Sequence, residues 1–325
     1  MRNIGKNGIL VTILLFFINC NKGEAASFPK KDFRVIGYIL TDDITNEKAS
    51  EFDFSKINYL NIAFLNPDST GNFVSIPHLP DVIMQAHAKN VQVLASLGGG
   101  NAPAFYTQLL SDTMRTVFLG KIVDMLVSNG FDGIDVDLEG ERIDSNYTSF
   151  IIELSGVLKF RKKLLTASVA TAYKDEYSDK ALSLFDFVNI MSYDKTGPWN
   201  PSNVGQHSPY DMAVSDILYW NKTRDISANK LNLGLPFYGY GFGNGVPPSI
   251  SFFELVAQYP GADNKDEIKV SNGGIIYYNG SNTIKKKTEL AMKDIGGVMI
   301  WQLMQDATGN NSLLNIIDNT IAPQK

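Results

Sequence analysis

Short apolar segments alternate along most of this chain with longer stretches whose apolar residues recur at helical spacing. The short segments predict eight β-strands, over Val35–Leu40, Tyr59–Leu65, Val91–Leu97, Gly133–Leu138, Leu164–Val169, Phe187–Ser192, Leu231–Leu235 and Gly297–Leu303. The longer stretches predict helices over Leu79–Ala88, Thr113–Ser128, Asn146–Leu158, Asp211–Trp220 and Lys285–Ile295. Repeated strand and helix units favour parallel strands joined by right-handed crossovers.

Eight such units are what a closed barrel requires, and a barrel of this kind needs roughly 250 residues. The chain has 325 residues and contains no low-complexity linker, so we predict an α/β fold with a single TIM (β/α)8 barrel domain over residues 33–320. Active sites of such barrels lie at the carboxyl ends of the strands.

The first residues have the pattern of an export signal. Arg2 and Lys6 precede an apolar run over residues 9–18, which is too short to span a bilayer. Ordinary cleavage near Ala25 is one possibility, and the other is a lipoprotein signal ending before Cys20, the only cysteine. We favour the lipoprotein and expect residues 1–25 to be signal, residues 26–32 a short linker, and Cys20 the lipidation site.

The expected location is therefore outside the cytoplasm, as a bacterial cell-surface or periplasmic lipoprotein or otherwise as a secreted protein. Composition fits an ordinary globular protein, with 44% hydrophobic and 19% charged residues. The net charge of −5 gives no reason to expect nucleic acid as a partner. We expect a monomer whose only contact with a membrane would be the lipid at Cys20.

The segment Phe131–Gly140 carries the strongest chemical signal. Asp135, Asp137 and Glu139 alternate with apolar residues, so their carboxylates project from one face of a strand. Crowded carboxylates in a buried strand cannot all ionise, and one held protonated near neutral pH can act as a general acid. The alternative is an exposed edge strand with solvated or calcium-binding acids. The chain has only three histidines and no evident ligand cluster, so we expect neither a metal nor a cofactor.

Four motifs, in order along the chain, resemble those of glycoside hydrolase family 18, which includes chitinases and endo-β-N-acetylglucosaminidases. The central one is the DxxDxDxE pattern formed by Asp132, Asp135, Asp137 and Glu139. The others are an SxGG motif at residues 96–99, an MxYD motif at residues 191–194, and a last strand that reaches Trp301. The resemblance covers residues 33–306.

The resemblance implies a substrate-assisted, retaining mechanism, which general accounts of glycosidases list as an exception to the two-carboxylate scheme. Glu139 would be the general acid and then the base, while Asp137 would hold the N–H of the substrate's 2-acetamido group. Asp135 would share a proton with Asp137. Tyr193 would donate to the acetamido oxygen.

Other residues are assigned to substrate binding or to support. Trp301 is expected under the reactive sugar, with Tyr38 and Phe64 beside it, since aromatic rings stack on pyranose faces. Asp194 either contacts substrate or caps a turn, and Trp199 either stacks on a sugar or plugs its loop. Ser96, Gly99 and Asp132 are interpreted as structural support, and Asp132 has the parity that points away from the barrel axis.

We expect hydrolysis of β-1,4-linked N-acetylglucosamine polymers or oligomers. Two alternatives stay open: an endo-β-N-acetylglucosaminidase acting on the chitobiose core of N-glycans, and a non-catalytic sugar-binding protein on the same barrel. The segment over residues 236–296 is short for the α+β insertion domain of some family members, so we predict none in full. It contains one further candidate strand over residues 275–278.

Overall fold

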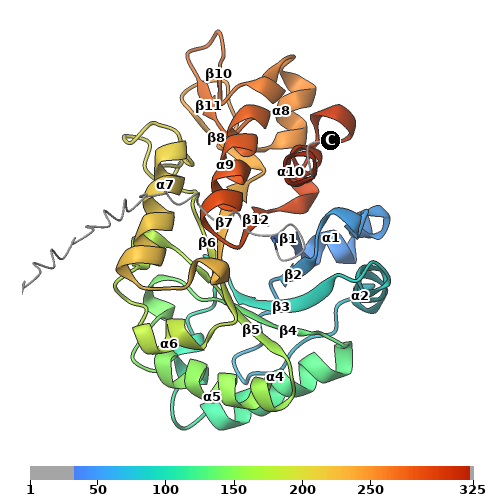
Figure 1. The fold of residues 1–325 in the computed structure, drawn as a ribbon, viewed down its shortest axis with the longest axis vertical. Helices are drawn as coiled ribbons and strands as arrows, with labels where there is room; N and C mark the ends of the chain where they lie inside the picture. Colours follow the sequence, from blue (N-terminus) through green and yellow to red (C-terminus); the bar gives the residue numbers. More distant parts are fainter. Residues whose placement is uncertain (1–32, 323–325) are drawn as a thin grey trace, which may run out of the picture.

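Eight parallel strands close into a barrel in the computed structural model, which describes residues 33–322 (Figure 1). The barrel order is β1-β12-β7-β6-β5-β4-β3-β2. The strands are β1 (Arg34–Leu40), β2 (Tyr59–Ala63), β3 (Gln92–Gly98), β4 (Gly133–Asp137), β5 (Leu164–Val169), β6 (Phe187–Ile190), β7 (Leu231–Pro236) and β12 (Gly297–Trp301). The predicted α/β barrel is confirmed, and each predicted strand lies at the expected place in the chain.

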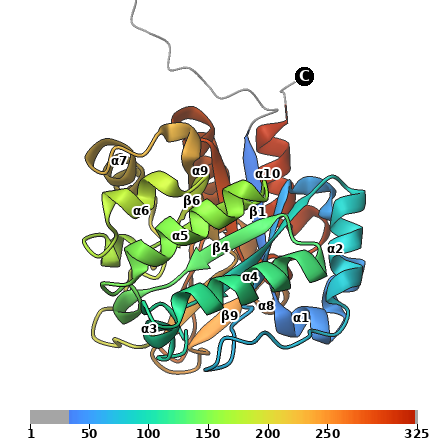
Figure 2. The same ribbon diagram turned by 90° about the horizontal axis from the view of Figure 1, so that it is seen from below.

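Helices cover the outside of the barrel, with α4 and α5 lying side by side over one part of it (Figure 2). Their bounds are α1 (Thr41–Thr45), α2 (Leu79–Ala88), α3 (Tyr106–Leu109), α4 (Arg115–Asn129), α5 (Tyr147–Phe160), α6 (Asp179–Leu184), α7 (Tyr210–Leu218), α8 (Phe252–Gln258), α9 (Ser281–Asp294) and α10 (Leu313–Ile321). The helix α2 has the predicted bounds. The helices α1, α3, α6, α8 and α10 were not predicted. The first four have seven residues or fewer, which is too short to establish a helical period.

The two faces of each barrel strand have different chemistry. Outward residues such as Ile134, Val136 and Leu138 are buried against the helices and belong to the main apolar core. Inward positions include polar side chains, of which Asp135 and Asn189 are fully buried, beside a second apolar cluster that contains Ile36, Phe187 and Met299. Polar groups inside a barrel are stable only when they bond to one another. The interior is therefore suited to holding a buried acid.

The connection between β7 and β12 is more than a loop. It forms a four-stranded antiparallel sheet in the order β10-β11-β8-β9, at the opposite end of the molecule from α4 and α5 in Figure 1. Its strands are β8 (Tyr238–Phe242), β9 (Ser249–Ser251), β10 (Glu267–Lys269) and β11 (Ile275–Tyr277). Ser251 and Glu254 form a capping box that starts α8 directly after β9. The sequence indicated only β11; β9 and β10 have three residues each, and β8 has glycine at two of its five positions.

The predictions for the first residues lie outside the part of the chain that the structure describes. These are the signal over residues 1–25, the lipidation of Cys20 and the linker over residues 26–32. Between residues 33 and 322, no helix has the length and apolar character needed to cross a membrane.

A close approach between β3 and β4 gives a test of this architecture. A Cβ atom added at Gly98, whose φ is +113°, would lie 2.1 Å from the carbonyl oxygen of Asp137. We expect Gly98→Ala to lower the free energy of unfolding by at least about 2 kcal/mol, since backbone cannot yield as a flexible side chain can. Urea unfolding monitored by circular dichroism measures the change.

The matched control is Gly120→Ala on α4, where an added Cβ would meet no atom within 4 Å. Alanine there should raise stability by about 0.5–1 kcal/mol, because glycine is unfavourable inside a helix. Equal effects of the two substitutions would contradict the close packing of β3 on β4.

Candidate active site

The three predicted acids lie at the carboxyl end of β4. Asp135 and Asp137 are the third and fifth residues of the strand, and Glu139 follows it in extended backbone. The register places Ser96 of β3 and Thr166 of β5 on either side of Asp135, and Gly98 beside Asp137. The period of two along β4 therefore delivers the carboxylates to the inside and mouth of the barrel.

Asp135 is enclosed by donors. Its Oδ2 accepts hydrogen bonds from Tyr38 Oη at 2.7 Å and from Ser96 Oγ at 2.9 Å, while Oδ1 accepts from Thr166 Oγ1 at 2.6 Å. Ser168 Oγ and Asn189 Nδ2 approach to 3.5 Å. Burial raises the pKa of Asp135, and these hydrogen bonds lower it, so burial has the larger effect.

Asp137 is buried without comparable support. Its Oδ1 has no hydrogen-bond partner among the described residues. Burial raises the pKa of Asp137 well above its usual range, and the charges of Glu139 and Asp135 raise it further. The hydrogen bonds described for Asp135 come from hydroxyl and amide groups and not from Asp137, so the expected shared proton has no direct contact here.

Glu139 is partly open to solvent at the barrel mouth. Burial raises its pKa to about 7, and the negative charge of Asp194 contributes to the same shift. A carboxyl group with this pKa can hold a proton at neutral pH and also release it, which suits an acid that later acts as a base.

Two of the predicted support residues, Ser96 and Gly99, lie in the SxGG segment at the end of β3. Ser96 donates to Asp135, as given above, and Gly99 N donates to the carbonyl oxygen of Asp137 at 2.7 Å. Gly99 has a φ of +83°, and a Cβ there would lie 2.4 Å from the ring of Phe64. Only glycine allows this conformation and this approach at once.

Tyr193 and Asp194 follow β6. The Tyr193 side chain is buried, and its hydroxyl lies 3.8 Å from Met299 Sδ. Asp194 has a left-handed backbone with φ of +62°. Its Oδ1 accepts a hydrogen bond from Tyr238 Oη and lies 3.5 Å from His207 Nδ1. Asp194 is therefore tied to β8 and to the returning end of its own loop.

The predicted aromatic residues Tyr38, Phe64 and Trp301 form one cluster. The Trp301 ring centroid lies 5.3 Å from that of Tyr38 and 5.5 Å from that of Phe64, and the Phe64 and Trp301 rings are stacked. Trp301 and Phe64 keep partial exposure, whereas Tyr38 is only 1% exposed. Tyr38 therefore lies below the surface as a donor to Asp135, and does not present its ring to solvent as a sugar platform would.

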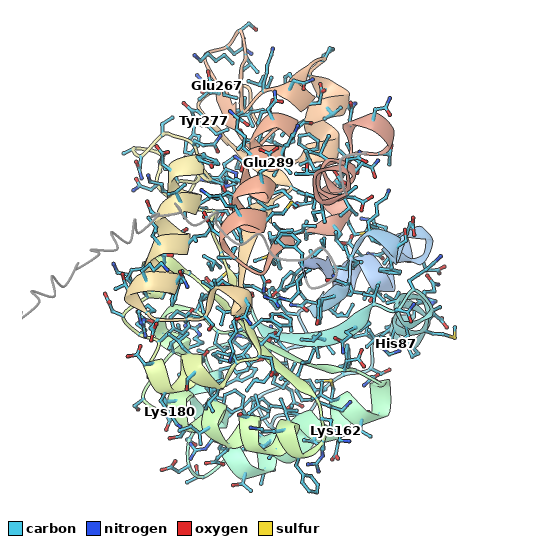
Figure 3. The ribbon with its side chains drawn as sticks, viewed as in Figure 1. His87, Lys162, Lys180, Glu267, Tyr277 and Glu289 are labelled. Carbon is cyan, nitrogen blue, oxygen red and sulfur yellow. The ribbon has the colours of Figure 1, made fainter. Side chains whose placement is uncertain are left out.

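Two predicted residues lie away from this group. Asp132, one residue before β4, accepts a hydrogen bond from Val93 N at 2.7 Å and makes a 2.9 Å contact with His87 on α2 (His87 is labelled in Figure 3). This agrees with a structural position. Trp199 is 60% exposed in the loop after β6, and its ring meets the ring of Tyr240 edge-on at 5.2 Å. Trp199 is thus not a buried plug for the loop.

The sequence interpretation missed several side chains of the site. Thr166, Ser168 and Asn189 surround Asp135, and the alternation along β5 and β6 was the signal that could have identified them. Tyr238 and Tyr240 belong to β8, a strand that was not predicted, and no local pattern relates them to Asp194.

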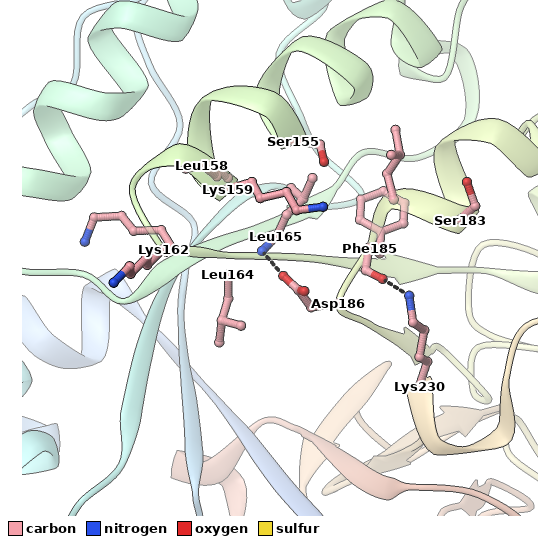
Figure 4. A pocket seen from close by; sticks show the side chains of 12 residues that line it. Ser155, Leu158, Lys159, Lys162, Leu164, Leu165, Ser183, Phe185, Asp186 and Lys230 are labelled. Atoms are coloured by element: carbon pink, nitrogen blue, oxygen red, sulfur yellow. Dashed lines mark hydrogen bonds between the residues drawn. The ribbon is translucent and has the colours of Figure 1, made fainter.

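Other places in the fold show less organisation. A pocket of about 390 Å³ opens at the amino-terminal ends of β5 and β6, and two of the polar groups that line it bond to the protein backbone (Figure 4). Asp186 accepts from Leu165 N at 2.9 Å, and Lys230 donates to the carbonyl oxygen of Phe185 at 2.8 Å. Within residues 33–322, no group of three or more histidine, cysteine, aspartate and glutamate side chains is arranged to hold a metal ion.

Comparison with known proteins agrees with this geometry. The family model for glycosyl hydrolases family 18 matches residues 34–306. The chain belongs to this family. A solved family 18 chitinase from the chitin utilization locus of Flavobacterium johnsoniae is 36% identical, with a TM-score of 0.81, covering 89% of this chain and 94% of that one. A solved chitinase from Bacteroides thetaiotaomicron is 28% identical, with a TM-score of 0.79, covering 89% and 96%.

Among curated proteins, chitinase A1 of Niallia circulans is 28% identical over 297 residues. The match covers 70% of this chain but only 42% of that protein. The match therefore spans less than half of the length of that relative.

The electrostatic coupling at the mouth of the family 18 barrel can be measured. We expect Asp194→Asn to lower the pKa of Glu139 from about 7, because a neighbouring negative charge is removed. Most of the shift should persist, since burial is its larger cause. Carbon-13 NMR titration of labelled glutamate would follow it. Asp132→Asn, at the other end of β4, is the control and should leave the pKa unchanged. A higher Glu139 pKa in Asp194→Asn would contradict this assignment.

Proposed function

We propose that this protein is a glycosidase that cleaves β-1,4 linkages in N-acetylglucosamine polymers or oligomers, with Glu139 as general acid and base. The observation that carries the proposal is the carboxyl group of Glu139, with a pKa raised to about 7, beside two more deeply buried acids at the barrel mouth. Membership of a glycoside hydrolase family supports the reaction class.

In the first step, Glu139 gives its proton to the leaving glycosidic oxygen as the bond to the anomeric carbon breaks. The carbonyl oxygen of the substrate's own 2-acetamido group attacks that carbon, which produces an oxazolinium ion. Asp137 accepts a hydrogen bond from the acetamido N–H and offsets the developing positive charge. Its unpartnered Oδ1 supports this role, because a buried carboxyl oxygen without a donor is available to a ligand.

In the second step, the carboxylate of Glu139 takes a proton from water while the water oxygen attacks the anomeric carbon. The oxazolinium ring opens, the acetamido group is restored, and the sugar keeps its configuration. Glu139 is protonated again at the end, so the cycle closes. A pKa near 7 suits both steps, because proton transfer is most effective when the pKa of the group is near the working pH.

Neighbouring groups have positioning roles in the proposal. The hydroxyl of Tyr193 donates to the acetamido oxygen and holds it near the anomeric carbon. The partly exposed ring of Trp301 provides an apolar surface under the sugar. Asp194 contacts the substrate or fixes the loop, and the exposed ring of Trp199 stacks on a sugar beyond the cleavage point. Asp135 keeps its hydrogen bonds, and its negative charge contributes to the raised pKa of Asp137.

Export is part of the proposal. The apolar run over residues 9–18 supports a secreted or surface location, where insoluble polysaccharide would be met, and Cys20 is the proposed lipid attachment site. Labelling of the protein by a fatty-acid analogue, and its loss in Cys20→Ala, would distinguish a lipoprotein from a freely secreted protein.

Replacement of Glu139 tests the central assignment. We expect Glu139→Gln to lower kcat on an N-acetylglucosamine hexamer by at least about 10²–10⁴-fold, the usual contribution of a general acid–base group, while oligomer binding persists. Glu141→Gln is the matched control, because Glu141 is two residues further on and its side chain is 94% exposed. Hydrolysis by Glu139→Gln at the wild-type rate would remove the assignment.

Substrate assistance has its own test. A hexamer of glucosamine, which lacks the acetyl groups, should bind but not be cleaved, because no acetamido oxygen can attack. Product release measured by mass spectrometry against the acetylated hexamer gives the comparison. Cleavage of both at similar rates would refute the mechanism. Cleavage of a high-mannose glycoprotein but not of the acetylated hexamer would favour an endo-β-N-acetylglucosaminidase instead.

A further inference from the structure

The loop after β6, which carries Tyr193 and Asp194, is held closed by hydrogen bonds between its two arms. Lys195 N donates to the carbonyl oxygen of His207 at 2.9 Å. Thr196 Oγ1 donates to the carbonyl oxygen of Gly205 at 2.6 Å, and Ser208 Oγ donates to that of Ser192 at 2.6 Å. The outgoing arm that bears the site residues is thus fixed to the returning arm.

The returning arm is fixed in turn by Lys287, a fully buried residue of α9. Its Nζ donates to the carbonyl oxygen and to Oγ of Ser208, both at 2.7 Å, and to Asn279 Oδ1 at 2.8 Å. Asn279 Nδ2 also donates to the Ser208 carbonyl oxygen at 2.9 Å. One buried amino group therefore joins α9, the end of the small sheet and the β6 loop.

The directions of these bonds can be assigned by counting protons. The hydroxyl proton of Ser208 points to the Ser192 carbonyl oxygen, so Ser208 Oγ must accept from Lys287. The three acceptors around Nζ match the three N–H groups of an ammonium ion. Lys287 in its charged form satisfies all of them, whereas a neutral amine has only two protons to give.

The surroundings of this charge are unusual. The acceptors of Lys287 are uncharged oxygens, and the acids that act on it from farther away are Asp266 and Asp216. Burial lowers the pKa of Lys287 to about 7, and those two acids oppose the shift. His207, also buried, lies next to Ser208, and its pKa is lowered by burial first and also by the Lys287 charge. A buried charge without a carboxylate partner is costly, so α9 holds it at the expense of stability.

We propose that Lys287 is a positioning residue for the active site, which acts through Ser208 on the Ser192 carbonyl and so on the adjacent Tyr193 and Asp194. The inference rests on the proposed function of those two residues. The neighbouring lysines of α9 are exposed, as is Glu289 two residues further on (Figure 3). Position 287 alone of these reaches the loop.

The test is Lys287→Met, which keeps the length of the side chain and removes its donors, compared with Lys286→Met one position away on the exposed face of α9. We expect kcat on the acetylated hexamer to fall about 10- to 100-fold, as for misplacement of reacting groups, with KM changed less than about threefold. A role in stability alone would leave the kcat of the folded fraction unchanged.

Amide hydrogen exchange without substrate provides a second measurement. Backbone amides of residues 192–208 should exchange at least about tenfold faster in Lys287→Met, while those of β3 and β4 stay protected. Ser208→Ala keeps the ammonium and removes its link to Ser192, so it should reproduce the effect even if Lys287→Met does not fold. In the double variant with both substitutions, the amides of residues 192–208 should exchange little faster than in either single variant.

Unchanged exchange in residues 192–208 of both variants, or equal acceleration throughout the barrel, would overturn the proposal. So would a fall in kcat in Lys286→Met equal to that in Lys287→Met. If the wild-type protein cleaved no oligomer, the proposed function would fail, yet the exchange measurement would still decide whether Lys287 fixes the loop.

Discussion

Burial of acidic side chains inside the barrel is the constraint on which the rest of this site depends. A carboxyl group removed from water is tolerated when donors replace the lost solvent, and Asp135 receives them from β1, β3 and β5. These donors contact Asp135, the most deeply buried of the three acids. Asp137 and Glu139, nearer the mouth, are left with raised pKa values because they have burial and like charge without an equal set of donors. A gradient of hydrogen bonding along one strand thus opposes the rise in pKa most strongly at Asp135 and least at Asp137 and Glu139.

The same interior explains why the barrel needs such close backbone packing at its mouth. Gly98 lets the end of β3 pass directly against the Asp137 carbonyl, and Gly99 lets the following backbone approach the Phe64 ring. The outward residues of the strands form an apolar core with α4, α5 and their neighbours. Asp135, Asp137 and Glu139 are not part of this core.

The sequence predicted the barrel well because its strands are short and largely apolar, and several of them are followed by a helix of regular period. It predicted the acids of β4 because side chains alternate between the two faces of every β-strand, so residues two positions apart share a face. It could not predict partners that come from other strands. Whether Tyr38 shows its ring to solvent or its hydroxyl to Asp135 depends on barrel closure, which brings together residues that are far apart in the chain. The same holds for Tyr238, whose strand has glycine at two of its five positions, and for Lys287, which is one of three consecutive lysines in the sequence.

The hairpin of β8 and β9 has a wider consequence. Tyr238 pairs with Ser251 at the base of the hairpin, beside the barrel, whereas its tip over residues 243–249 is largely exposed and turns on Gly243 and Gly245, both with positive φ. Strand pairing at the base does not depend on what is attached at the tip. Additional residues, or a whole accessory domain, could therefore be inserted at that tip without moving Tyr238, which donates a hydrogen bond to Asp194.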